Sequence, residues 1–121
     1  MSMKLGMVEA QFADILWQHA PVSTRKLVTL CAEKLNWKRT TTYTVLKKLC
    51  DRGIFETKDS LVTVRITKDA FHAMQSTEFV EETFHGSLPA FIAAFSSRKQ
   101  LSREELEEIR QMIDSLEEVT Q

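Results

Sequence analysis

The order of periodic segments in the first half of the chain constrains its fold more than any other feature. Three helix-length stretches, in which apolar residues recur every three or four positions, precede two short runs rich in β-branched residues. The five segments are residues 8–19, 23–36, 40–52, 54–58 and 61–66. Three helices followed by a two-stranded hairpin predict a winged helix-turn-helix, which is mainly α with a small β-hairpin wing.

Residues that start or stop helices separate these segments. Pro21 ends the first helix, and Ser23 caps the second after a short extended link at Val22. Asn36 and Gly53 end the second and third helices, because both residues tolerate the left-handed conformation. The residues predicted to form the core are Val8, Phe12, Ile15, Leu16, Leu27, Leu30, Cys31, Leu35, Thr42, Val45, Leu46, Leu49, Ile54, Val62, Val64 and Ile66.

The second half of the chain reads as three further helices. The first covers residues 69–85 and is ended by Gly86, and the second covers residues 87–95. Ser102 followed by Glu105 three positions later is a capping box, which predicts the start of the last helix.

We therefore predict two domains, a winged helix-turn-helix DNA-binding domain over residues 1–67 and a three-helix dimerisation region over residues 68–121. Five of the seven Phe residues fall in the second region, and its three short helices offer too few neighbours to bury them. A twofold homodimer solves this problem because the same surface meets itself. In the alternative, these helices fold back on the winged domain. The predicted dimerisation residues are Phe79, Phe84, Leu88, Phe91, Phe95, Leu106, Ile109, Met112, Ile113 and Leu116.

The net charge of −1 hides an asymmetry between the two regions. Residues 1–67 carry eleven Lys and Arg against six Asp and Glu, a net charge of +5. Residues 68–121 carry five against eleven, a net charge of −6. Only the first region is therefore expected to approach a polyanion.

The third helical segment combines four Thr within five residues with a Tyr and several cations. Helix interiors normally avoid Thr, because β-branching restricts χ1 and the hydroxyl competes for backbone hydrogen bonds. This composition therefore indicates a surface that touches a ligand, and hydroxyls with cations suit the phosphates and base edges of double-stranded DNA. The alternative is a capped, amphipathic surface helix.

The DNA contacts are predicted from helical phase and from the position of each residue. The third helix would enter the major groove, the N-terminus of the second would favour a phosphate, and wing cations would contact the backbone or the minor groove. Tyr43 is expected to pack on a sugar or donate to a phosphate. The predicted DNA-binding residues are Ser23, Thr24, Lys38, Arg39, Thr40, Thr41, Tyr43, Thr44, Lys47, Lys48, Lys58 and Arg65.

Several of these motifs resemble the penicillinase-repressor family, the transcriptional regulators of β-lactamase and methicillin-resistance operons. The resemblance covers nearly the whole chain, and its most specific part is the third helical segment. The matching segments are Leu16-Trp17, Val22-Ser23, Thr40-Thr41-Thr42-Tyr43-Thr44-Val45-Leu46-Lys47-Lys48-Leu49, Arg52-Gly53-Ile54, Gly86-Ser87, Phe95 and the helix from Leu101 to Leu116.

The resemblance implies a homodimeric repressor that binds a palindromic operator through its winged domains. It also implies a sensor/protease partner that cleaves the C-terminal region. The family's cleaved bond joins Asn and Phe, and the matching candidate site here is Ala94–Phe95, which keeps only the Phe. Copper-responsive relatives carry a C-terminal cysteine cluster, whereas no Cys follows Cys50 in this chain. We therefore predict no metal site and no cofactor.

Other function classes have less support in the sequence. His19, His72 and His85 are scattered and accompany no catalytic motif, so the chain is not expected to be an enzyme. A winged helix used only for protein binding is the main alternative, and a monomeric architectural DNA binder is another. The chain has no membrane-spanning run and no signal-peptide core, so we expect a soluble, cytoplasmic protein with its two cysteines as buried free thiols.

Overall fold

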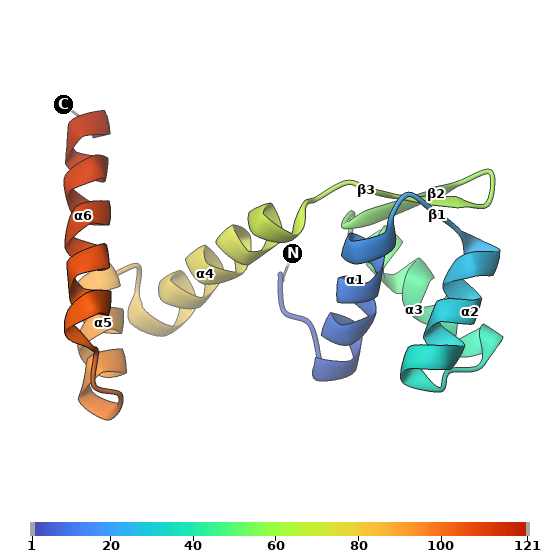
Figure 1. Cartoon of the computed structure of the whole chain (residues 1–121), viewed down its shortest axis with the longest axis horizontal. Helices are drawn as coiled ribbons and strands as arrows, with labels where there is room; N and C mark the ends of the chain where they lie inside the picture. The colour runs from blue at the N-terminus through green and yellow to red at the C-terminus, as the bar shows by residue number, and fades with distance from the viewer. Residues whose placement is uncertain (1, 121) are drawn as a thin grey trace. The chain divides into compact units, whose positions relative to one another are not determined.

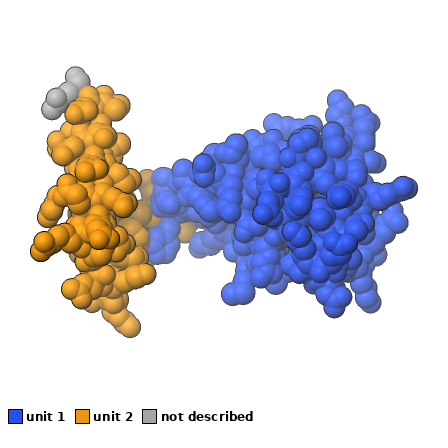
Figure 2. All heavy atoms as spheres, in the orientation of Figure 1, with its two compact units in different colours: residues 1–79 blue, residues 80–121 orange. Residues whose placement is uncertain are grey.

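The computed structural model of the chain describes residues 2–120. Two compact units, residues 1–79 and residues 80–121, are coloured separately in Figure 2. No helix in the described part of the chain is both long and apolar enough to cross a bilayer. The elements in chain order are α1 (Met7–His19), β1 (Val22–Ser23), α2 (Thr24–Leu35), α3 (Arg39–Asp51), β2 (Phe55–Lys58), β3 (Leu61–Val64), α4 (Lys68–Phe84), α5 (Leu88–Arg98) and α6 (Arg103–Thr120) (Figure 1).

The first unit is a winged helix-turn-helix, which confirms the predicted fold class. Strands β2 and β3 form the antiparallel hairpin of the wing, with Lys58 paired to Leu61 at its tip. A third strand extends this sheet, because β1 pairs with β3 through Val22 and Val62 and gives the order β1-β3-β2. The predicted link at Val22 is thus a strand, and its pairing is a tertiary contact that the local sequence pattern does not reveal.

The predicted helix caps are confirmed by their hydrogen bonds and backbone angles. The Ser23 hydroxyl accepts a backbone N–H of the first turn of α2 at 3.1 Å. Asn36 ends α2 with a left-handed φ of 56°, and Gly53 follows α3 with a φ of 80°. At the start of α6, Glu105 N–H donates to the Ser102 hydroxyl at 3.1 Å and Ser102 N–H donates to the Glu105 carboxylate at 3.2 Å.

Most of the predicted core is buried. Leu35, Val45 and Ile66 are half-buried and pack against it. Val8 and Val64 are exposed, with exposed fractions of 52% and 37%, because they occupy the first turn of α1 and the last position of β3. The apolar face of a helix or strand can be predicted from its sequence, but the position at which it extends beyond its packing partners cannot. The core residues confirmed as buried are Phe12, Ile15, Leu16, Leu27, Leu30, Cys31, Thr42, Leu46, Leu49, Ile54 and Val62.

The two cysteines differ in their surroundings. Cys31 is buried, and burial raises the pKa of its thiol. Cys50 is only half-buried, contrary to the prediction, and its Sγ lies 3.5 Å from the Thr57 hydroxyl. Both are free thiols.

Phe71 belongs to the core of the first unit. It was predicted to be one of the Phe residues of the dimerisation region, but its side chain is only 1% exposed in the core of the first unit. Its ring centroid lies 5.5 Å from that of Trp17, which also contacts Phe55 and donates its indole N–H to the Ile66 carbonyl at 3.0 Å. The first turns of α4 therefore complete this core, and the first compact unit extends to Phe79.

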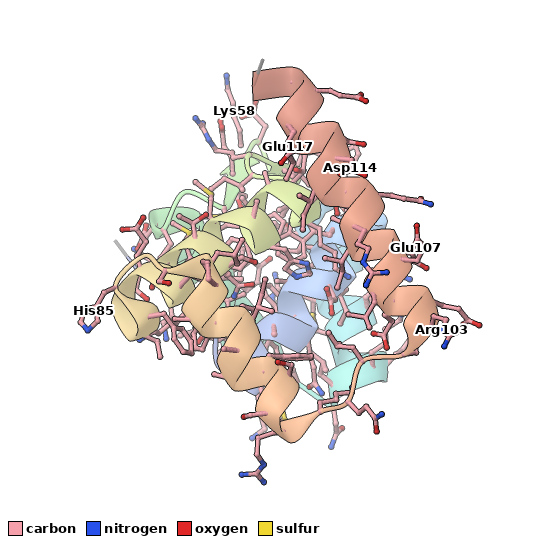
Figure 3. All side chains as sticks on the ribbon, turned by 90° about the vertical axis from the view of Figure 1, so that its left-hand side faces the viewer. Lys58, His85, Arg103, Glu107, Asp114 and Glu117 are labelled. Atoms are coloured by element: carbon pink, nitrogen blue, oxygen red, sulfur yellow. The ribbon has the colours of Figure 1, made fainter. Side chains whose placement is uncertain are left out.

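The second unit contains the end of α4 together with α5 and α6, and its described residues form no enclosed core. Phe91 contacts Phe84 and Phe95, with ring centroids 5.7 and 6.1 Å apart. Helix α5 leads through a loop into α6 (Figure 3). None of the side chains described for residues 80–119 is buried. So small a unit gains little stability from burial of its own surface.

Candidate nucleic-acid interface

The outward face of α3 follows the predicted helical phase. Thr42, Leu46 and Leu49 are buried in the core, and the Thr42 hydroxyl donates to the Lys38 carbonyl at 3.3 Å. The residues predicted to face outward, Thr40, Thr41, Tyr43, Thr44, Lys47 and Lys48, are all exposed, and so are the preceding Lys38 and Arg39. The helix therefore has one face in the core and an opposite face of hydroxyls, an aromatic ring and cations.

The exposed threonines of α3 present methyl groups and oxygens of defined polarity. The Thr44 hydroxyl donates to the Thr40 carbonyl at 2.9 Å, so its proton is used within the helix. Its oxygen keeps lone pairs that can accept a hydrogen bond, and its methyl group is available for contact with thymine. At about 100° per residue, Thr40, Thr44 and Lys47 share the centre of the exposed face.

A polar groove of about 480 Å³ lies beside this face and includes the N-terminus of α2 and the wing turn. Tyr43 lies at its edge, and Thr24 and Arg39 line the same groove. Hydrogen bonding from these two side chains, Thr24 first, lowers the pKa of Tyr43. The Arg39 guanidinium is also 5.6 Å from the centroid of the Tyr43 ring. The residues that line the groove are Ser23, Thr24, Arg25, Arg39, Tyr43 and Ser60.

Thr24 occupies a different position from the one expected of an exposed phosphate contact. It is only 9% exposed, and its backbone N–H donates to the Ser60 carbonyl at 2.9 Å. Its side chain lines the same groove as Tyr43 and lowers the pKa of Tyr43. Two other groove residues, Arg25 and Ser60, were missed by the sequence analysis. Arg25 could have been found from its place in the first turn of α2, where an anion is favoured.

Three of the predicted DNA-binding cations are paired with carboxylates. Lys47 lies 2.8 Å from Asp51 one turn further along α3, and this carboxylate raises the pKa of Lys47. The Lys47–Asp51 pair could have been predicted from the sequence, because residues four positions apart are neighbours on a helix surface. Arg65 pairs with Glu56 across the wing at 2.6 Å. Lys58, at the tip of the wing, is exposed.

The third pair joins Lys48 of α3 to Glu9 of α1 at 3.0 Å. Lys48 is rotated by about 100° from Lys47 around the helix, and the pair shows that it faces α1. Glu9 is itself partly enclosed, and its pKa is lowered first by the Gly6 N–H and then by Lys48. Lys48 is therefore less available to a phosphate than Lys47, a difference that helical phase alone does not establish.

Comparison with known proteins gives the family of the chain. The family model described as "Penicillinase repressor" matches residues 5–115. The chain belongs to the penicillinase-repressor family. Its members are transcriptional regulators and not enzymes, and the winged helix-turn-helix of this member fits a DNA-binding transcriptional repressor.

Two curated relatives each align over 115 positions and cover 92% of this chain. The penicillinase repressor of Bacillus licheniformis is 23% identical, and the alignment covers 90% of its length. The methicillin resistance regulatory protein MecI of Staphylococcus aureus is 18% identical, with 94% of its length covered. A solved structure of Staphylococcus aureus MarR in complex with salicylate and kanamycin has a TM-score of 0.44 at 12% identity, covering 96% of this chain and 73% of that one.

Proposed function

We propose that this protein is a homodimeric repressor that reads a twofold-symmetric DNA operator with α3. The observation that carries the proposal is the exposed face of α3, where Thr40, Thr44 and Lys47 lie beside the polar groove that Tyr43 borders. A helix with such a face enters the major groove with its N-terminal residues nearest the bases. A family of repressors and a basic first unit are consistent with this role.

Each part of the interface has a distinct task in this proposal. Thr40, Thr41 and Thr44 contact base edges and thymine methyl groups, and therefore set the sequence preference. Lys47 and Lys38 neutralise phosphates, which contributes affinity without sequence preference.

The polar groove receives a backbone phosphate in this proposal. Arg39 supplies positive charge, Ser23 and Tyr43 supply hydroxyls, and the N-terminus of α2 adds the positive end of its dipole. In the wing, Lys58 and Arg65 contact the backbone or the minor groove of the flanking duplex.

The homodimer is supported by the apolar surface of the second unit. None of its described side chains is buried, yet large apolar residues lie along α5 and α6, and Leu88, Met112 and Leu116 are among the most exposed. The charged residues Arg103 and Glu107 project from α6 away from its ribbon (Figure 3). A second copy would cover the apolar stripe and leave the charged side in water. The interface we propose contains Phe79, Phe84, Leu88, Phe91, Phe95, Leu106, Ile109, Met112, Ile113 and Leu116.

For release from DNA, Ala94–Phe95 is the cleavage site that we propose for a sensor-linked protease. Both residues lie inside α5, where the Phe95 carbonyl accepts the Lys99 N–H at 3.1 Å and the Ala94 carbonyl accepts the Ser97 hydroxyl at 2.7 Å. Cleavage therefore requires α5 to unwind locally, and an intact dimer would oppose that opening.

Selection from a random duplex pool at near-physiological salt, with the full chain, tests the proposal. We expect enrichment of a twofold-symmetric site, and we expect a Thr40→Val, Thr44→Val variant to select a different or weaker consensus. Binding without enrichment would replace the proposal with an architectural role. A lack of binding even at low salt would leave a winged-helix protein-interaction module as the function.

A further inference from the structure

Residues 2–5 form an N-terminal arm that connects α3 to α4 within the first unit. The Ser2 carbonyl accepts a hydrogen bond from the guanidinium of Arg52, the C-cap residue of α3. The Met3 N–H donates to Glu78 Oε2 at 2.7 Å, and the Ser2 hydroxyl donates to Glu78 Oε1 at 3.0 Å. Gln75, one turn earlier on α4, donates from its side-chain amide to the Met3 carbonyl at 3.0 Å. The arm is therefore hydrogen-bonded to the C-terminal end of α3 and also to α4.

Glu78 is the main attachment point of this arm on α4. Both of its carboxylate oxygens accept hydrogen bonds from the arm, and these are charge-assisted bonds. The Met3 N–H, followed by the Ser2 hydroxyl and the charge of Lys4, lowers the pKa of Glu78. A small pocket of about 180 Å³ lies between the arm and α4, lined by Met3, Lys4, Gln75, Glu78 and Phe79. The Glu78 carboxylate thus attaches the arm to α4, which lies outside the helix-turn-helix itself.

A second set of contacts, made by Glu9, stabilises the same side of α3. Glu9 accepts the Gly6 N–H at 3.1 Å and pairs with Lys48 at 3.0 Å. Lys48 and Arg52 are four residues apart, so they lie one turn apart on one side of α3. Thr41 lies on the same side two turns before Lys48. The arm and the start of α1 therefore hold the flank of α3 that leads to its proposed base-reading threonines.

We infer that Glu78 is a positioning residue for DNA recognition, which acts on α3 through the N-terminal arm and Arg52. This inference rests on the proposed function, because it takes α3 as the element that reads DNA. Glu78 itself touches no DNA in this arrangement. Helix α4 continues beyond Phe79 into the second unit. A change that moves or unwinds α4 would therefore weaken the hydrogen bonds of the arm and alter the position of α3.

The test combines operator affinity with backbone hydrogen exchange in four proteins, each measured against the parent chain. These are Glu78→Ala, a deletion of residues 2–5, the two changes together, and the control Glu81→Ala, which removes an exposed carboxylate one turn further along α4. We expect Glu78→Ala and the deletion each to weaken binding to the selected site on the order of tenfold, in line with the loss of charge-assisted hydrogen bonds. The double variant should be no weaker than the deletion alone, and Glu81→Ala should match the parent.

Hydrogen exchange provides the readout that does not require DNA. Amides 48–53 should exchange faster in Glu78→Ala and in the deletion, whereas amides of α1 should not change, because general destabilisation would affect both. A Glu78→Gln variant keeps one acceptor oxygen and should recover part of the affinity and protection; it also serves if the Ala variant does not fold. Parent-like affinity and exchange in Glu78→Ala or in the deletion variant would overturn the inference. Failure of the parent to bind DNA would instead overturn the proposed function, with the exchange data still testing the arm.

Discussion

Replacement of Met112 by Asp is expected to convert the proposed dimer into monomers. Met112 is 64% exposed in the single chain and lies on the apolar stripe of α6. Full burial of such a side chain contributes about 1.5–3 kcal/mol, and a twofold interface contains it twice. The substitution therefore removes about 3–6 kcal/mol of association free energy, before the added cost of desolvating two carboxylates. The dimer Kd should rise roughly 10²- to 10⁴-fold.

Analytical ultracentrifugation over a range of protein concentrations measures this shift. The matched control is Gln111→Asp, which adds the same charge about 100° around α6 from Met112, on the side that faces away from the centre of the stripe. The control should retain the parent Kd, and circular dichroism should show the same helix content in all three proteins. An unchanged Kd for Met112→Asp would refute the argument that this stripe forms the dimer interface.

The remaining predictions concern the winged unit. Lys47→Ala should lower the slope of log affinity against log salt by about 0.9 for each phosphate that the variant no longer neutralises, whereas Lys48→Ala should change it little; equal slopes for both would contradict the assignment of Lys48 to α1. Phe71→Ala should cost about 3–5 kcal/mol in urea denaturation of the first unit, because it leaves a cavity beside Trp17; a cost below about 1 kcal/mol would place Phe71 outside the core. Glu9→Gln tests whether the stability of the first unit depends on the ionisation of Glu9. The lowered pKa of Glu9 means that its contribution is complete above its ordinary value of 4.5 and is lost as pH falls through the folded-state pKa. Parent and variant should therefore differ in stability near neutral pH and converge in acid, and a constant difference across this range would count against the Glu9 contacts.

The sequence predicted those parts of the fold that depend on local chemistry. Ser23, Asn36 and the Ser102–Glu105 capping box determine helix ends through contacts within a few residues, and each was correctly predicted. The period of apolar residues in α3 also separated its buried side from its exposed side correctly.

Contacts between distant segments were harder to predict. The pairing of β1 with β3 and the burial of Phe71 against Trp17 depend on how the chain returns on itself. The same reason explains the ion pair of Lys48 with Glu9, which lies thirty-nine positions earlier in the sequence. In the candidate site, residue types predicted the ligand class, whereas the groove that brings Thr24 and Tyr43 together required the three-dimensional structure.

The pairing of cations with carboxylates also bears on how the repressor would be released. Lys47, Lys48 and Arg65 each lie within 3.0 Å of a carboxylate, which reduces the positive field that one winged unit presents to DNA. A single unit should therefore bind a half-site weakly. Joining two units raises the effective concentration of the second to the millimolar range, so the affinity of the proposed dimer exceeds that of either unit by orders of magnitude. Any event that separates the apolar stripes of α6 would remove this gain without altering α3, and dissociation of the dimer alone would then suffice to free the operator.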